Sequence, residues 1–178
     1  MPSMLSLSGE TLDVLLRLVA ATLVGMVLGL NRDLKGKPTG ARTLALVSLG
    51  AALVAVSMVH YPGMAGNPDA MSRVLQGIIQ GVMTGVGFIG AGVIVHGRSP
   101  DGVRNLTTAA TVWVTAALGI ACALAAWKVV WIGAGLTLVV LLVGSSLERA
   151  AAWLLGAVAA KAEDGSAPDT DAEDGDGR

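Results

Sequence analysis

The sequence predicts an all-α membrane protein with five transmembrane helices, and this prediction rests on composition and on the distribution of charge. Of its 178 residues, 53% are hydrophobic, only 14% are charged and 24 are glycine. The mean hydropathy is +0.69. Average soluble proteins carry about 25% charged residues, so this chain could not cover a soluble core with a water-facing surface. We therefore expect a lipid bilayer to surround it.

The expected spans follow from hydrophobic length, since a bilayer core needs about 20 helical residues. One stretch, residues 18–31, reaches that length only if its helix begins near Thr11 and includes Arg17. Asp13 and Arg17 are then spaced i,i+4 and can pair, with the arginine as an interfacial anchor. The other four charge-free stretches are residues 43–68, 74–95, 105–127 and 129–147.

The chain divides into segments of different composition. Residues 1–145 form the expected transmembrane domain, and residues 146–162 have too short an apolar run for a sixth span and favour an interfacial amphipathic helix. Residues 163–178 hold seven of the thirteen acidic residues among small residues, which is typical of a disordered tail. The N-terminus has no basic region before its apolar run, which argues against a cleaved signal peptide.

Basic residues determine the expected orientation, because basic loops stay in the cytoplasm. An odd number of spans then places the N-terminus outside and the C-terminus in the cytoplasm. The basic residues that fall inside are Arg32, Lys35, Lys37, Arg42, Arg98, Arg104, Arg149 and Lys161.

The two basic loops resemble each other. Residues 36–44 (GKPTGARTL) match residues 97–106 (GRSPDGVRNL) with one residue inserted, and Gly29 and Gly90 lie at the same offset upstream. We interpret this as a parallel repeat, in which the first two helices recur as the third and fourth. Alternatively, glycine, proline and arginine are simply common in short cytoplasmic turns.

Each loop brings an arginine next to a residue suited to cap the following helix: Arg42 before Thr43, and Arg104 before Asn105. Free N–H groups, the helix dipole and a guanidinium suit an anion, such as a lipid phosphate, the Asp33 carboxylate or a phosphorylated ligand. Plain headgroup anchoring is the simpler alternative. The residues expected to contact an anion or a lipid headgroup are Arg32, Lys37, Arg42, Thr43, Arg98, Arg104 and Asn105.

The third expected helix is rich in glycine. A first stripe at every fourth residue allows close helix packing, and the denser glycines that follow would permit a kink or an unwound stretch beside a cavity. Packing alone is the simpler interpretation. The residues expected to serve as packing or hinge positions are Gly77, Gly81, Gly85, Gly87, Gly90 and Gly92.

Small polar residues on the fourth expected helix share one face at i,i+4 spacing. Their hydroxyls either bond back to helix carbonyls or, opposite the glycine-rich helix, line a buried polar path. The residues expected on such a polar or ion path are Asn31, Asp33, Gln80, Thr84, Thr107, Thr108 and Thr111.

Enzymatic chemistry is not expected. One cysteine excludes a disulfide and a cysteine-rich zinc site within one chain, and two histidines leave very little material for His-based metal clusters and triads. The expected spans also lack paired carboxylates and an activated nucleophile, so an intramembrane enzyme is disfavoured.

Three ordered motifs resemble those of the MgtC/SapB family of bacterial inner-membrane proteins. The resemblance covers residues 11–145 and implies five spans with the C-terminus inside. It also implies a link to survival in low magnesium, to virulence inside macrophages and, in some members, to acid tolerance. The motifs are GLNRDLKGKPTGART at 29–43, GVGFIGAGVI at 85–94 and VRNLTTAATVW at 103–113.

The chain departs from the family pattern in two ways. Many members carry Glu-Arg-Glu where this chain has Asn31, Arg32 and Asp33, so a cation-binding role of the first acid does not transfer to Asn31. Longer members carry a cytoplasmic C-terminal domain that is not expected here, so functions of that domain are not transferred either.

Two functions follow as expectations. The first is a protein of magnesium or acid-stress homeostasis that acts through partner membrane proteins. The alternative is an ion transporter or channel, for example for Mg²⁺, with a path between the first, third and fourth helices. Against transport, the spans hold no acidic residue deep in the bilayer, and Mg²⁺ normally binds carboxylates.

The expected partners are the bilayer, other membrane proteins and a second copy of the chain in a homodimer, and no nucleic acid. No cofactor is firmly expected, and Mg²⁺ is the one candidate.

Overall fold

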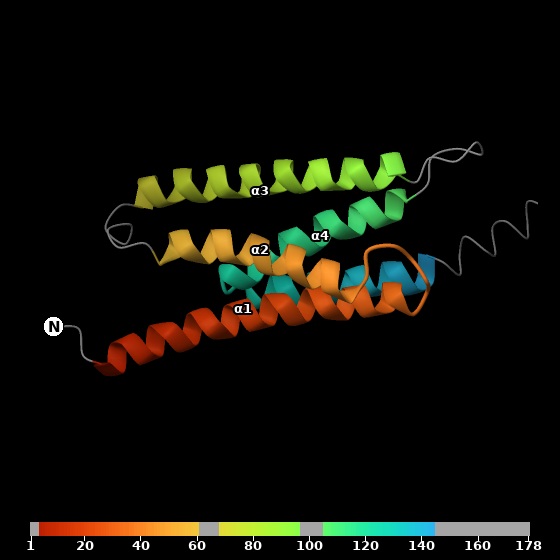
Figure 1. Ribbon diagram of the computed structural model, residues 1–178. Helices are drawn as coiled ribbons and strands as arrows, with labels where there is room; N and C mark the ends of the chain where they lie inside the picture. The colour runs from red at the N-terminus through yellow and green to blue at the C-terminus, as the bar shows by residue number, and fades with distance from the viewer. Residues whose placement is uncertain (1–3, 61–67, 97–104, 145–178) are drawn as a thin grey trace, which may run out of the picture. The chain divides into compact units, whose positions relative to one another are not determined.

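The computed structural model describes residues 4–60, 68–96 and 105–144, and in these ranges the regular secondary structure is entirely α-helical. It comprises α1 (Met4–Asp33), α2 (Ala41–Val59), α3 (Pro68–His96) and α4 (Leu106–Ala123) (Figure 1). A further helix runs over Trp127–Gly144. The predicted interfacial helix at 146–162 and the acidic tail at 163–178 lie outside the described residues.

In the described part of the chain, five helices are long and apolar enough to cross a membrane, as the sequence predicted. The first span includes Arg17, so its helix begins where the prediction required. The spans are Gly9–Asp33, Ala41–Val59, Pro68–Val95, Leu106–Ala123 and Trp127–Gly144.

Residues 1–139 form one compact unit in which α2 and α4 lie at the centre. Both of these helices contact α1 on one side and α3 on the other, as Figure 1 shows, and they also contact each other. In the described part of the chain α1 and α3 do not meet. The most buried span is α4, whereas α3 and the helix Trp127–Gly144 are the least buried. The core therefore consists of α1, α2 and α4, with α3 at its side.

Small residues let the three core helices approach each other closely. A Cβ atom on Gly25 of α1 would lie 2.9 Å from the Cα atom of Ala45 in α2. A Cβ atom on Gly119 of α4 would lie 2.9 Å from the carbonyl carbon of Ser48 in α2. These contacts are with backbone, which cannot swing aside, so small side chains are required here.

Most glycines of α3 do not make the close helix contacts that the sequence led us to expect. A Cβ atom on Gly77, Gly81 or Gly85 would meet nothing within 4 Å, and the same holds for Gly87 and Gly92. Only Gly90 faces a neighbour, the Cβ atom of Ala109 at an ordinary 3.5 Å. The helix is also continuous from Pro68 to His96, without the kink or unwound stretch that its dense glycines permitted. Within residues 1–139, the closest helix contacts therefore belong to other glycines.

The turn between α1 and α2 brings a carbonyl oxygen back over the end of α1. Gly36 has a φ of 60°, a left-handed conformation that glycine adopts without steric cost. The N–H of Lys37 donates to the carbonyl of Arg32 at 3.0 Å, which closes the turn. The capping residue of α2 is Gly40, so the expected cap at Thr43 is wrong, because the helix begins three residues earlier than that cap requires. The parallel repeat stays a prediction.

We expect Gly119→Ala to destabilise the protein, because its new Cβ atom would overlap the backbone of Ser48 and separate α4 from α2. Overpacking of this kind typically costs about 1–3 kcal/mol. The matched control is Gly81→Ala, whose Cβ atom enters open space and which gains up to about 1 kcal/mol of helix propensity. Thermal unfolding in detergent measures both, and equal midpoints for the two variants would contradict the packing described.

Candidate functional site

A buried arginine joins three parts of the chain at one end of the core. Arg32, one residue before the end of α1, is only 4% exposed. Its guanidinium donates to the hydroxyl oxygens of Thr108 and of Thr111 on α4, the latter at 3.3 Å. It also donates to the carbonyl oxygen of Pro38 in the α1–α2 turn, from Nε at 3.3 Å and from a terminal nitrogen at 3.1 Å. We call these four residues the Arg32 cluster.

The hydroxyl of Thr111 is fixed in direction by this arrangement. It donates its single proton to the carbonyl oxygen of Thr107 at 2.6 Å, so its lone pairs face the guanidinium. Thr115, one turn further on, donates back to the carbonyl oxygen of Thr111 at 2.8 Å. The hydroxyls of Thr111 and Thr115 therefore bond back to the helix, which is the first of the two interpretations. The buried polar path stays a prediction.

Asp33 caps the neighbouring helix. Its Oδ2 atom accepts a hydrogen bond from the N–H of Ala41, the first residue of α2, at 2.8 Å. A carboxylate at this position is favoured by the N–H groups and the positive end of the helix dipole. A side chain at Gly40 would overlap the Asp33 carboxyl group in its present position, so Asp33 would have to move to make room for it. Of the three anions that the sequence suggested for this helix start, the structure places the Asp33 carboxylate at it.

The residues expected on an ion path do not lie together. Arg32 occupies the position between α1 and α4 where Thr108 and Thr111 are buried. By contrast Gln80, Thr84 and Thr107 are exposed, and Asn31 is partly buried on α1. In the described ranges, no group of three His, Cys, Asp or Glu side chains is placed to hold a metal ion.

The residues expected to contact an anion or a lipid headgroup also differ in burial. Arg32 is buried, whereas Lys37, Arg42 and Thr43 are exposed near the start of α2. Asn105 is the N-cap residue of α4, as predicted, but its side chain makes no capping hydrogen bond and instead donates to the carbonyl of Val93 at 3.5 Å. Arg98 and Arg104 lie outside the described residues.

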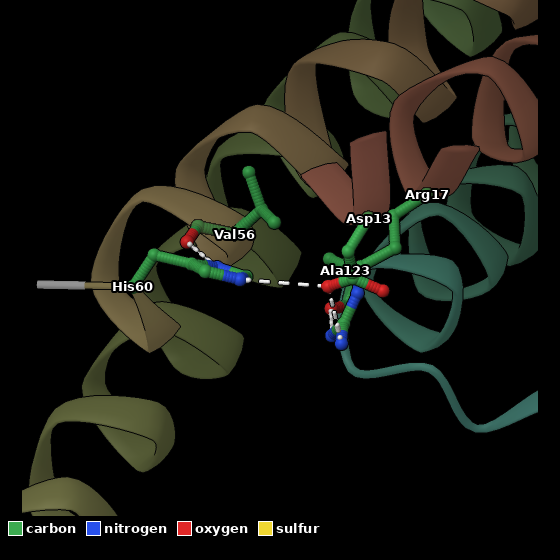
Figure 2. A network of polar contacts seen from close by, with 5 residues as sticks. All are labelled: Asp13, Arg17, Val56, His60 and Ala123. Atoms are coloured by element: carbon green, nitrogen blue, oxygen red, sulfur yellow. Dashed lines mark hydrogen bonds and ion pairs between the residues drawn. The ribbon is translucent and has the colours of Figure 1, made fainter. Parts of the chain in front are cut away.

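A second polar cluster joins the same three helices at their other ends (Figure 2). Arg17 pairs with Asp13 at 2.8 Å, which confirms the predicted i,i+4 pair. It also donates to the carbonyl oxygen of Ala123 at 2.7 Å, at the end of α4 where the helix dipole is negative. His60, the C-cap of α2, lies 3.5 Å from the Asp13 carboxylate. We call these four residues the Asp13 cluster.

Sequence reasoning missed His60 and the contact of Arg17 with α4. Asp13 and Arg17 are neighbours on one helix, so their spacing reveals the pair. His60 and Ala123 come from distant parts of the chain, so no spacing links them to Asp13 and Arg17. The five-span topology places these helix ends on the same side, and this is the only sequence signal for the two contacts.

The exposed side of α3 carries three further polar residues of the spans, Gln76, Gln80 and Thr84. We define its outward face by Gln76, Gly77, Gln80, Gly81, Thr84 and Gly85, all of which are exposed. Beside it, an open apolar groove of about 500 Å³ lies between α2 and α3, with Gly50, Val54, Val82 and Gly85 in its lining.

Comparison with known proteins identifies similar chains. The model of the MgtC family matches residues 18–150. Protein SrpB of Synechococcus elongatus is 41% identical over 153 residues, which cover 82% of each chain. Protein SapB of Bacillus subtilis is 37% identical over 116 residues, and protein MgtC of Salmonella typhimurium is 40% identical over 114 residues. These two matches span 47% and 45% of the respective relatives, about half their length. No solved structure matches.

We expect Thr108→Val to destabilise the protein more than Thr107→Val. The first substitution keeps the shape of the side chain but leaves a buried guanidinium N–H without an acceptor, which costs about 1–3 kcal/mol. Thr107 is exposed on the same helix one residue earlier, so its substitution controls for the change of residue type. Unfolding midpoints in detergent compare the two, and an equal effect would show that the Arg32 cluster contributes no stability.

Proposed function

Because the chain belongs to the MgtC family, we propose that it is a multi-pass inner-membrane protein of magnesium homeostasis and stress survival that acts by binding other membrane proteins. Family membership supports the link to magnesium and stress. The N-terminus outside and the C-terminus in the cytoplasm remain part of the proposal, on the strength of the basic loops. With this orientation the Arg32 cluster faces the cytoplasm and the Asp13 cluster faces outward.

The observation that carries the proposal is the outward face of α3. Gln80 lies close to the middle of the 28-residue span Pro68–Val95, yet it is exposed, as is Gln76 one turn earlier. An amide left without a hydrogen-bond partner in hydrocarbon costs about 2–7 kcal/mol. A helix of another protein could supply that partner, because each amide offers both donors and acceptors.

The glycines beside these amides support the same conclusion. Gly77 and Gly81 leave open space next to Gln76 and Gln80, so another backbone could approach to hydrogen-bonding distance. The core of this chain uses its own glycines in that way, at Gly25 and Gly119. Because each amide offers both donors and acceptors, a second copy of this face could also supply the partner, as the expected homodimer requires.

The Arg32 cluster weighs against the alternative, a Mg²⁺ transporter. The path would have to pass Thr108 and Thr111, whose oxygens already accept from a buried guanidinium. A divalent cation about 5 Å from that charge would be repelled by about 7 kcal/mol at an effective dielectric constant of about 20. Asp33, the one carboxylate expected on the path, is bonded to the start of α2.

We expect purified protein in liposomes loaded with a magnesium-sensitive dye to show no flux above that of empty vesicles, in either orientation. The Asp33→Asn variant is a suitable comparison, because asparagine still accepts the hydrogen bond from the N–H of Ala41 while the charge is removed. Flux that is present in the unmodified protein and lost in this variant would establish transport and refute the proposal.

We expect Gly81→Leu to abolish rescue of low-magnesium growth in a strain that lacks this protein, and to reduce dimer mass in detergent. The leucine would block the outward face of α3, and its Cβ atom would meet nothing within 4 Å in the described residues. The matched control is Gly135→Leu, which also enters open space but on the helix Trp127–Gly144. Full rescue by folded Gly81→Leu would exclude α3 as the partner surface, and unchanged mass would exclude it from the dimer.

A further inference from the structure

The Asp13 cluster contains a histidine whose protonation state decides how it meets a carboxylate. The Nδ1 atom of His60 lies 3.1 Å from the carbonyl oxygen of Val56, one turn earlier on α2. A carbonyl oxygen only accepts hydrogen bonds, so a hydrogen bond at this contact requires the proton on Nδ1. In the neutral ring the other nitrogen, Nε2, is therefore unprotonated.

This unprotonated nitrogen faces the Asp13 carboxylate. Nε2 lies 3.5 Å from the Oδ2 atom of Asp13, so in the neutral ring two acceptors oppose each other without a proton between them. Addition of a proton to Nε2 creates a charged N–H group that points at a negative oxygen. The contact then changes from an unfavourable pair of acceptors to a charge-assisted hydrogen bond.

The groups around His60 carry charges of both signs. The same Oδ2 atom of Asp13 accepts from Arg17, so protonation would place the carboxylate between two cations. The group that α4 contributes to the cluster is the carbonyl of Ala123, which carries no charge. Glu10, one turn before Asp13 on α1, is exposed and adds a second negative charge on that side. The His60 and Asp13 side chains are 29% and 46% exposed, so water can deliver the proton.

We propose that the Asp13 cluster is an acid-strengthened clasp, in which protonation of His60 at Nε2 binds the end of α2 to the start of α1. Because Arg17 connects Asp13 to the last residue of α4, the clasp extends to the end of the third core helix (Figure 2). Histidine is the side chain whose charge ordinarily changes between about pH 5 and 8. The clasp would therefore tighten over that range as the pH falls. It depends neither on the orientation in the membrane nor on the proposed function.

The protonation pattern can be read directly by ¹⁵N NMR of histidine-labelled protein in nanodiscs. The chain has two histidines, so the variant His96→Gln leaves the signals of His60 alone. At about pH 8 we expect the tautomer with hydrogen on Nδ1, and at about pH 5 the doubly protonated ring. The opposite neutral tautomer, with hydrogen on Nε2, would overturn the proposal.

Stability measurements test the coupling between the two groups. The unfolding equilibrium in detergent is compared for the unmodified protein, His60→Gln, Asp13→Asn and the double variant at about pH 5 and pH 8. We expect a coupling of about two- to five-fold at the lower pH, in the range of partly exposed ion pairs, and none at the higher pH. Equal coupling at both pH values would refute the clasp.

A second comparison remains decisive if Asp13→Asn does not fold, because that variant also removes the partner of Arg17. The shift of the unfolding midpoint between about pH 8 and pH 5 is compared for His60→Gln and His96→Gln. We expect the acid stabilisation to be lost in the first variant and kept in the second. An unchanged shift in His60→Gln would show that the stabilisation does not arise from the Asp13 cluster.

Discussion

The guanidinium of Arg32 is the interaction on which this end of the bundle depends. A charge buried among helices must receive its hydrogen bonds from the protein, since lipid offers none. Arg32 obtains them from the turn that follows its own helix and from two threonines of α4. The position of the turn then sets where α2 begins, and Asp33 secures that start. Residues that would suit an ion path in isolation thus serve to hold helices together.

The two polar clusters involve some of the helices and leave out α3. Each cluster joins α1, its neighbour α2 or the α1–α2 turn, and α4, one at either end of the core. Between them the helices meet through small residues, such as Gly25 and Gly119. Neither cluster includes a side chain from α3, which contacts only α2 and α4 among the other labelled helices. The two clusters therefore hold the core of α1, α2 and α4 together at both ends. The helix α3 packs beside this core without joining either cluster, and it carries the exposed amides.

The sequence predicted what depends on local properties. Hydrophobic length predicted the spans, and i,i+4 spacing predicted the pair of Asp13 and Arg17. Partners across helices could not be predicted, because nothing in the sequence links Arg32 to Thr108 or His60 to Asp13. The glycines show most clearly what could not be predicted from the sequence. Dense spacing drew attention to α3, but whether a glycine is needed for packing depends on which backbone lies opposite, and that is decided by tertiary structure.

The unequal lengths of the helices have a mechanical consequence. The 18 residues of the span in α4 rise about 27 Å, slightly less than a hydrocarbon core of about 30 Å, whereas the 28 residues in α3 rise about 42 Å. No single bilayer thickness matches both helices held upright. The longer one must lean, or extend into the headgroups, by an amount that the surrounding lipid decides. Membrane thickness would thus tune the angle at which the glutamines of α3 meet a neighbour.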